Sequence, residues 1–419
     1  MRTLLRRAYP LALCTALALA ACGTAHAVGG DTPEARPPVE LPIELIESVP
    51  VETTLDHPEI RDAWEVWPEM IGRAERSLDV AQFYVVSEPG KRLAPVLDAI
   101  VAAGARGVRV RILADAKFAE EYHADLDRLD AADNIDVAIW DVGPTLGGVL
   151  HAKYFVVDGR EAYLGSQNFD WRSLEHIQEL GVRTTVPEVV GVMAEIFAAD
   201  WALANGGGDA PKPAHVAASA FPAKTRLGGE DAEITAVASP TKWLPDEGLW
   251  DLPRLVAMID GARERVRVQL LSYATRHRGE PPFETLDEAL RRAALRGVKV
   301  ELLVSNWNLR GDRLPALEGL ARTPGIEVRF VAIPQATTGF IPFARVCHSK
   351  LMVVDGDLGW VGTSNWGGGY FHESRNVGVI VKSAPFAKQL AGVFRTTWES
   401  RYAETLVPGR RYEPPKISE

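Results

Sequence analysis

Two stretches of the chain carry the same reactive side chains at the same spacing. The first reads HAKYFVVDGREAYLGSQN from His151 to Asn168, and the second reads HSKLMVVDGDLGWVGTSN from His348 to Asn365. Both follow the pattern H-x-K-x4-D-x6-G-[ST]-x-N. Coincidence is a poor explanation for a pattern of this length that occurs twice in one chain. The repetition predicts one site that is built from two similar halves.

These side chains suit a reaction at phosphorus. One imidazole can attack phosphorus while the other protonates the leaving oxygen, because histidine takes both protonation states near neutral pH. Lysine, hydroxyl and amide groups can neutralise and hydrogen-bond the non-bridging oxygens of a phosphoryl transition state. Lysine can supply the positive charge that Mg²⁺ supplies elsewhere, and the sequence shows no tight cluster of metal ligands. We therefore predict a phosphodiester-cleaving site that needs no metal and no cofactor. Its predicted catalytic residues are His151, Lys153, Asp158, His348, Lys350 and Asp355, and its predicted substrate-binding residues include Ser166, Asn168, Thr363 and Asn365.

The local geometry of the first copy follows from strand periodicity. His151 and Lys153 are two residues apart, so both side chains point to one face of a strand. Asp158-Gly159 then reads as a two-residue hairpin turn. This turn would place His151 opposite Ser166 and bring imidazole, ammonium, hydroxyl and amide to one edge.

The second copy predicts the same geometry, with His348 opposite Thr363. Asp158 and Asp355 each precede a glycine in the expected turn, so a structural role is the alternative to a catalytic one. The hydroxyl and Asn residues also have an alternative, as ordinary turn residues.

The elements that must position these motifs alternate between strands and helices, and they occur twice. This alternation predicts an α/β fold with a mixed or mostly parallel sheet in each half. The repeat is also visible outside the motif, because Gly107-Val108 returns as Gly297-Val298. The first half is predicted to contain strands at 77–86, 108–113 and 135–140 and helices at 93–103 and 187–202; the second half is predicted to contain strands at 265–273 and 297–303 and a helix at 286–295.

Length and composition set the expected domain organisation. A chain of 419 residues favours two domains, and a stretch rich in Gly, Pro and Ala marks the boundary between them. We expect a first domain at 42–206, a linker at 207–228, a second domain at 229–405 and a tail at 406–419. The net charge of −10 argues against non-specific coating of nucleic acid, but it allows a small basic pocket for one phosphate.

The N-terminus has the composition of an export signal. A basic start is followed by an apolar run at 11–20 that is short for a membrane span. Leu19-Ala20-Ala21-Cys22 resembles a bacterial lipobox, which implies a lipoprotein signal peptide at 1–21, lipidation of Cys22 and a flexible tether at 22–41. The alternative is cleavage after Ala27, which would release a secreted protein. Both alternatives predict export, and the first predicts a protein anchored to a membrane of the cell envelope.

The doubled motif resembles the phospholipase D superfamily, in which two H-x-K-x4-D halves form one site. The segments HAKYFVVDGREAYLGSQNFDWRSLEHIQELGV and GTSNWGGGYF are similar to the animal lysosomal members that act as 5′ exonucleases on single strands, and poxvirus envelope proteins look similar too. The resemblance extends from about Leu45 to Tyr402. It implies two similar α/β domains, each a mixed sheet flanked by helices, with one active site at their interface.

The resemblance also implies roles for individual residues. The family forms a covalent phosphohistidine, and by analogy His151 is the nucleophile and His348 the general acid. Glu179 lies 28 residues after His151, where the family often places a carboxylate that orients a histidine; we associate it with His151 and add it to the predicted substrate-binding set, and a surface charge is the alternative. The matching position in the second half holds Asn376.

The sequence constrains the substrate and the oligomeric state less than it constrains the fold and the reaction. A single-stranded nucleic acid end follows from the closer resemblance, whereas a phospholipid, hydrolysed or transphosphatidylated, follows from the expected membrane location and the wider superfamily. A non-catalytic envelope scaffold is a third hypothesis, and the two intact His-Lys pairs argue against it. One chain supplies both halves of the site, so a monomer suffices.

Overall fold

The computed structural model describes residues 41–206, 216–276, 281–311 and 313–418. The expected signal peptide, the Cys22 that was expected to carry lipid, and residues 22–40 of the expected tether lie outside this part of the chain. The described residues belong to one compact unit, Leu41–Glu419. We refer to residues 41–206 as the first half and to residues 216–418 as the second half.

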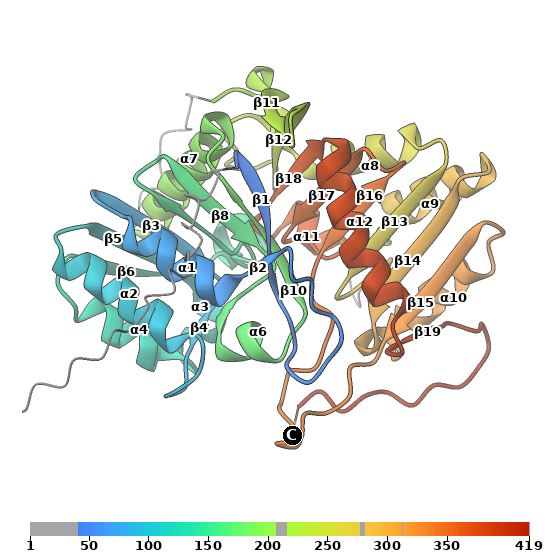
Figure 1. The fold of residues 1–419 in the computed structure, drawn as a ribbon, viewed down its shortest axis with the longest axis horizontal. Helices are drawn as coiled ribbons and strands as arrows, with labels where there is room; N and C mark the ends of the chain where they lie inside the picture. The colour runs from blue at the N-terminus through green and yellow to red at the C-terminus, as the bar shows by residue number, and fades with distance from the viewer. Residues whose placement is uncertain (1–40, 207–215, 277–280, 312, 419) are drawn as a thin grey trace, which may run out of the picture. The chain divides into compact units, whose positions relative to one another are not determined.

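The first half is built on an eight-stranded mixed sheet in the order β2-β1-β10-β8-β7-β3-β5-β6 (Figure 1). Strands β3, β5 and β6 are parallel, and β7 runs antiparallel to β3. The strands are β1 (Ile43–Ser48), β2 (Arg61–Asp62), β3 (Ser77–Gln82), β5 (Arg109–Asp115), β6 (Ile135–Trp140), β7 (Tyr154–Val157), β8 (Glu161–Gly165) and β10 (Glu179–Thr184), with the short pair β4 (Val85–Val86) and β9 (Phe169–Asp170) beside them. The helices are α1 (Ala63–Gly72), α2 (Ala94–Ala105), α3 (Ala116–Ala119), α4 (His123–Asp130), α5 (Gly143–Leu146), α6 (Trp171–Glu175) and α7 (Pro187–Ala204).

The second half repeats this plan in a nine-stranded sheet, β11-β12-β18-β17-β16-β13-β14-β15-β19. Its seven strands from β12 to β15 follow the order of β1 to β6 in the first sheet, which confirms the internal duplication. The strands are β11 (Ala223–Leu227), β12 (Glu230–Ser239), β13 (Arg265–Leu270), β14 (Lys299–Ser305), β15 (Ile326–Val331), β16 (Leu351–Val354), β17 (Leu358–Gly362), β18 (Asn376–Lys382) and β19 (Ala403–Thr405). The helices are α8 (Asp251–Gly261), α9 (Thr285–Leu295), α10 (Arg313–Ala321), α11 (Gly368–His372) and α12 (Ala384–Glu399).

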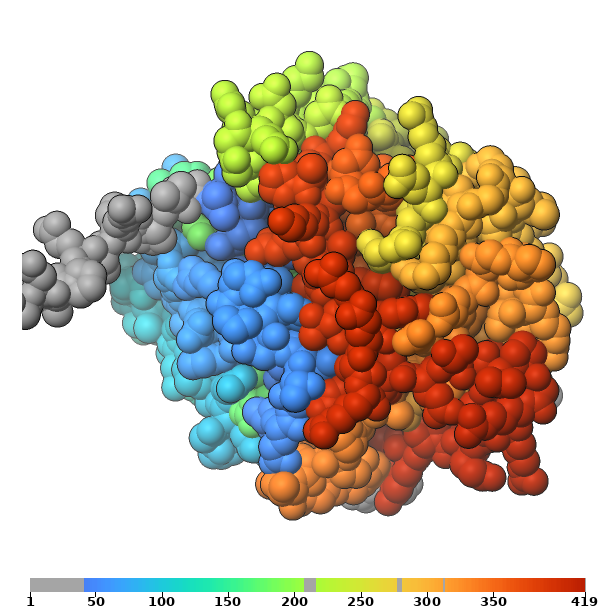
Figure 2. Space-filling view, turned by 45° about the vertical axis from the view of Figure 1, so that its right-hand side comes forward, coloured from blue at the N-terminus to red at the C-terminus, as the bar shows by residue number. Residues whose placement is uncertain are grey.

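Helices α7 and α12 occupy matching places in the two halves, each after the last strand of its motif. Their apolar faces join residues of both sheets in one continuous hydrophobic cluster, which includes Met193 and Phe197 of α7 and Leu390 and Phe394 of α12. Figure 2 shows the blue surface of the first half meeting the red surface of the second half directly. The halves therefore share a core, because burying apolar surface between them is as favourable as burying it within each sheet.

Two ends of the second half differ from expectation. Residues 223–227 were expected in a linker, but they form the edge strand β11 and pair with β12. The expected tail is also packed in part, because Leu406 is 3% exposed and Ile417 is 9% exposed.

The motif hairpins have three-residue turns, and the two-residue turn expected from Asp158-Gly159 is wrong. Strand β7 pairs Val157 with Glu161, which leaves 158–160 as the turn. The second hairpin pairs Val354 with Leu358, which leaves 355–357. The extra turn residue shifts the pairing of the two hairpin strands by one position. Because side chains alternate between the two faces of a strand, the residue now opposite a given position points to the face opposite to the one expected. His151 is therefore not opposite Ser166, and His348 is not opposite Thr363.

Candidate active site

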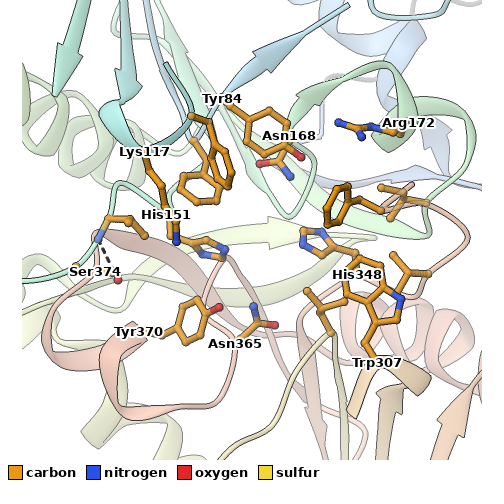
Figure 3. Close-up of a pocket in the computed structure, with 18 of the residues that line it drawn as sticks. Tyr84, Lys117, His151, Asn168, Arg172, Trp307, His348, Asn365, Tyr370 and Ser374 are labelled. Carbon is orange, nitrogen blue, oxygen red and sulfur yellow. Dashed lines mark hydrogen bonds between the residues drawn. The ribbon is translucent and has the colours of Figure 1, made fainter. Parts of the chain in front are cut away.

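A cavity of about 500 Å³ lies where the two motifs meet, and both histidines line it (Figure 3). The imidazoles of His151 and His348 point toward one another from opposite sides. Aromatic side chains form much of the remaining wall: Phe83, Tyr84, Phe118, Tyr122, Trp307, Phe343 and Tyr370.

Each histidine is held by the backbone of the other half. The His151 amide donates to the carbonyl of Arg375 at 3.0 Å, and the His348 amide donates to the carbonyl of Gln178 at 2.8 Å. Two isolated parallel bridges, Leu150 with Arg375 and Gln178 with Cys347, run beside these bonds. The backbone of each half thus fixes the motif histidine of the other half.

Each histidine side chain is likewise held by a residue of the other half. His151 Nδ1 lies 2.9 Å from Asn376 Oδ1, and His348 Nδ1 lies 2.6 Å from Glu179 Oε2. The amide of Asn376 is oriented because its Nδ2 donates to the carbonyls of Tyr370 and Ser374. Its Oδ1 must therefore accept, so Nδ1 of His151 carries a proton and Nε2 is unprotonated in the neutral ring.

The partner of Glu179 is a correction to the sequence-based expectation. Glu179 was expected to orient a histidine and was associated with His151, but it contacts His348 across the junction. It is 1% exposed and is not among the described residues that line the cavity, so the structure gives it the place of a residue that orients His348, not that of a substrate-binding residue. Ser173 donates to its other oxygen at 2.8 Å.

Burial sets the protonation of this pair. Burial raises the pKa of Glu179 to about 7, and burial together with Lys350 and Lys153 lowers the pKa of His348 well below its ordinary value. Glu179 therefore changes its protonation state near neutral pH, and the neutral form of His348 is favoured over that of a solvent-exposed histidine. A carboxylate at Nδ1 favours the imidazolium form of His348 over that of a histidine with a neutral partner.

The surroundings of His151 favour its neutral form. Burial, followed by the charges of Lys153 and Lys350, lowers the pKa of His151 well below its ordinary value. Its ring also packs edge-on between Phe83 and Tyr370, with ring centres 5.5 and 4.9 Å away. A neutral imidazole with Nδ1 protonated presents its Nε2 lone pair to the cavity.

Lys153 and Lys350 are fully buried, each behind its own histidine. Each ammonium donates to the backbone carbonyl of the histidine two residues earlier, His151 or His348. Burial lowers the pKa of Lys153 well below its ordinary value and lowers that of Lys350 to about 7. The lysines were expected to bind phosphate oxygens; the structure places them close enough to act on both histidines, but outside the described wall of the cavity.

Asn168 and Asn365 both line the cavity, as a phosphate-binding role requires. Asn365 Oδ1 accepts from the Ser272 amide at 3.2 Å, while its Nδ2 is buried and has no hydrogen-bond partner among the described residues. An unpartnered buried N–H is costly, so a non-bridging phosphate oxygen is a fitting acceptor.

Ser166 and Thr363 lie behind the site, and their expected role in substrate binding is corrected. Both are fully buried and neither is among the described cavity-lining residues. The Ser166 hydroxyl contacts the main chain of Leu180 and lowers the pKa of Glu179, and Thr363 donates to Asn376 Oδ1 at 2.9 Å. Each hydroxyl therefore positions the residue that holds a histidine, as the one-residue register shift requires.

Asp158 and Asp355 have the structural role, not the catalytic one. Both adopt positive φ, at 53° and 51°, in the hairpin turns. The Asp158 carboxylate accepts from the amides of residues 75–77, and the Asp355 carboxylate accepts from those of residues 263–265. These bonds lower the pKa of Asp158 to about 2. Neither residue is among those described as lining the cavity.

Several lining residues were missed from the sequence. Phe83 and Tyr84 follow strand β3, and Lys117 and Phe118 follow strand β5. Residues just beyond the carboxyl ends of parallel strands commonly meet at a site, and this rule could have identified them. Tyr370 on α11 had no comparable signal, because its position depends on how the second half packs against the first.

The described residues also allow two negative findings. No group of three or more His, Cys, Asp or Glu side chains in the described ranges is arranged to hold a metal ion. No helix within those ranges is long and apolar enough to cross a membrane.

Comparisons with known proteins agree with this architecture. The family model "Cardiolipin synthase, PLD-like domain" matches twice, at residues 68–201 and 255–398. Phospholipase D Z of Dictyostelium discoideum is 31% identical over 386 residues, which cover 86% of this chain and 90% of that protein. The human 5'-3' exonuclease PLD3 is 32% identical over 432 residues, which cover 94% of this chain and 87% of that protein.

Among solved structures, the phosphatidylserine synthase of Haemophilus influenzae Rd KW20 has a similar fold. The TM-score is 0.56 at 12% identity, and the match covers 82% of this chain and 85% of that chain. Two family matches, one over each half, and relatives that are similar over nearly the whole chain lead to one conclusion: the chain belongs to the phospholipase D-like family, whose members include phosphodiester-cleaving enzymes.

Proposed function

We propose that the protein cleaves phosphodiesters through a covalent phosphohistidine on His151. One observation carries the proposal: two imidazoles face each other across one cavity, with Nδ1 of each held by a different kind of partner. A neutral amide beside His151 leaves a nucleophilic Nε2, and a carboxylate beside His348 supports the protonated ring that a general acid needs.

In the first step, Nε2 of His151 attacks phosphorus and the bond to the leaving oxygen breaks. His348 donates its Nε2 proton to that oxygen, so the leaving group departs as an alcohol. In the second step, His348 takes a proton from water, the water oxygen attacks phosphorus, and the phosphorus–nitrogen bond breaks. Asn365 and Asn168 hydrogen-bond the non-bridging oxygens, and Lys350, which is protonated below its pKa of about 7, supplies positive charge.

A single-stranded nucleic acid end is the substrate that the site supports best. The wall is rich in aromatic side chains, and successive bases stack on such surfaces. Relatives that match this chain over 87% of their own length are named 5'-3' exonucleases. A phospholipid is the second candidate, because other relatives are named phospholipase D.

The deciding experiment compares two substrates with the full-length protein. Single-stranded DNA with a 5′-hydroxyl and phosphatidylcholine vesicles are incubated side by side in the presence of a chelator, with His151→Ala as the control. We expect the DNA to be shortened and the lipid to remain intact. Lipid cleavage alone would replace nucleic acid by phospholipid as the substrate, and no cleavage of either would favour a non-catalytic scaffold.

We also propose that the protein is exported and anchored to a membrane of the cell envelope through lipid on Cys22. The sequence LAAC at 19–22 supports this proposal. Metabolic labelling with a palmitate analogue should mark the wild-type protein and leave Cys22→Ala unmarked. Cleavage after Ala27, read from the N-terminus of the mature protein, would contradict it.

A further inference from the structure

The duplication gives each cavity-lining residue a counterpart in the other half. Strand pairing in the two sheets aligns Ser77 and Arg109 with Arg265 and Lys299. Lys117 lies two positions after the end of β5. Under this alignment it corresponds to the residue two positions after the end of β14. That residue is Trp307, and both Lys117 and Trp307 line the cavity.

The centre of the cavity is therefore symmetric, whereas its outer wall is not. The two histidines and the two Asn residues occupy equivalent positions in the two motifs, and all four line the cavity. At the next pair of equivalent positions, one half supplies the ammonium of Lys117 and the other supplies the indole of Trp307. Figure 3 shows Lys117 on the side of His151 and Trp307 on the side of His348.

The ammonium of Lys117 is available for an anion. It forms no ion pair among the described residues: its charge acts on Asp115 without an ion-pair contact, and the Asp115 carboxylate accepts from the main-chain amides of Lys117 and Leu150. Its Nζ lies 5.7 Å from the ring centre of Phe118, so the side chain extends along the aromatic wall.

The other long cation of the wall is already neutralised. Arg172 bonds both carboxylate oxygens of Asp170 and the carbonyl of Pro342. Glu121 also lines the cavity, and it interacts with the hydroxyl of Tyr122. Of the two long cations that line the described cavity, Lys117 is thus the one with no carboxylate at ion-pair distance among the described residues.

We propose that Lys117 binds the phosphate adjacent to the one that is cleaved. This inference rests on the proposed function and narrows it to a substrate with consecutive phosphodiesters, as in a nucleic acid strand. Phosphatidylcholine offers a single phosphate and has no group for this position. The hydrophobic and aromatic surface around Lys117, formed by Phe118 and Tyr84, can pack against the intervening nucleoside.

The test uses three substrates that differ in phosphate number: bis-p-nitrophenyl phosphate, a dinucleotide with one phosphodiester and a trinucleotide with two. We expect Lys117→Met to lower kcat/KM for the trinucleotide about tenfold, through KM, and to leave the other two substrates nearly unchanged. For the trinucleotide, the slope of log KM against log salt concentration should be smaller by about 0.7 in Lys117→Met than in the wild-type protein, because about 0.7 is the value for one phosphate contact on a single strand.

Lys117→Arg and Lys388→Met serve as matched variants. Lys117→Arg keeps the charge and should retain the preference for the trinucleotide; Lys388 is exposed on α12 and its change should have no effect. Equal losses on all three substrates, or no loss on the trinucleotide, would overturn the inference. A wild-type protein that cleaves bis-p-nitrophenyl phosphate but neither oligonucleotide would instead overturn the nucleic acid function on which the inference rests.

Discussion

Glu179 belongs to the first half and His348 to the second, and their side chains meet at 2.6 Å. The equivalent contact in the other direction joins Asn376 to His151 at 2.9 Å. The two histidines thus occupy equivalent positions but have a carboxylate in one case and an amide in the other. This difference separates the proposed acid from the proposed nucleophile, and it leads to several predictions.

Removing the carboxylate should weaken the acid. In Glu179→Gln, His348 loses the charge that favours its protonated form, so we expect kcat for a nucleic acid substrate to fall by about 10²- to 10⁴-fold. KM should change little, because Glu179 is buried behind the histidine. Steady-state kinetics on a 5′-hydroxyl oligonucleotide measures both. Glu230→Gln, an exposed change on β12, is the control, and equal losses in both variants would argue against the assigned role.

The leaving group should distinguish the two histidines. A p-nitrophenolate leaves without protonation, so His348→Ala should still release one equivalent of p-nitrophenol from bis-p-nitrophenyl phosphate and then stall as a phosphoenzyme. His151→Ala should release none, since it lacks the nucleophile. A rapid-mixing burst assay followed by peptide mapping checks both outcomes. A phosphorylated peptide that contains His348 in the wild-type protein would reverse the assignment.

The pH dependence follows from the pKa shifts. Protonation of His151 stops the attack, and its pKa lies below the ordinary value of about 6.5, so activity should persist as pH falls below that value. The proton shared by His348 and Glu179 is lost near the Glu179 pKa of about 7, so activity should decline above it. We therefore expect kcat/KM to peak at mildly acidic pH. A maximum above pH 8 would contradict this.

Asp158 should matter for stability. Its carboxylate is held by three backbone amides, and its folded-state pKa of about 2 lies below the ordinary value. The stabilisation is therefore present above about pH 4 and is lost as pH falls toward 2. Asp158→Asn should lower the free energy of unfolding at pH 7 by about 1.5–3 kcal/mol. Denaturant unfolding of the wild-type protein and of Asp158→Asn at pH 7 and pH 3 measures this difference in the free energy of unfolding.

The deficit of Asp158→Asn should shrink at the lower pH, while kcat/KM stays near that of the wild-type protein. Asp136→Asn, an exposed change on β6, is the control. A thousandfold loss of kcat in a stably folded Asp158→Asn would restore the catalytic role that the sequence first suggested.

The sequence motif was sufficient to predict the duplicated fold and both histidines of the cavity. Their residue types and spacing recur, and strand periodicity is a local property. The hairpin register was wrong by one residue, because an Asp-Gly pair fits both two- and three-residue turns and only the packing of the sheet selects between them. This one-residue shift moved Ser166 and Thr363 from the substrate side to the supporting side.

The partner of each histidine could not be obtained from spacing along the chain. Glu179 is closer in sequence to His151 than to His348, but the contact depends on how β10 and the second motif pack across the junction. The same holds for Tyr370, which reaches His151 from the other half. Tertiary packing between halves therefore determined the residues that distinguish the two histidines.

The contacts of Glu179 and Asn376 also bear on why two such halves are joined in one chain. In a dimer of identical half-length chains, two-fold symmetry would place the same residue beside both histidines. A substitution that suited the acid would then be imposed on the nucleophile as well. A fused chain has no such restriction, since each copy mutates separately while the pair is inherited together. Covalent linkage thus allows the two histidines to specialise independently.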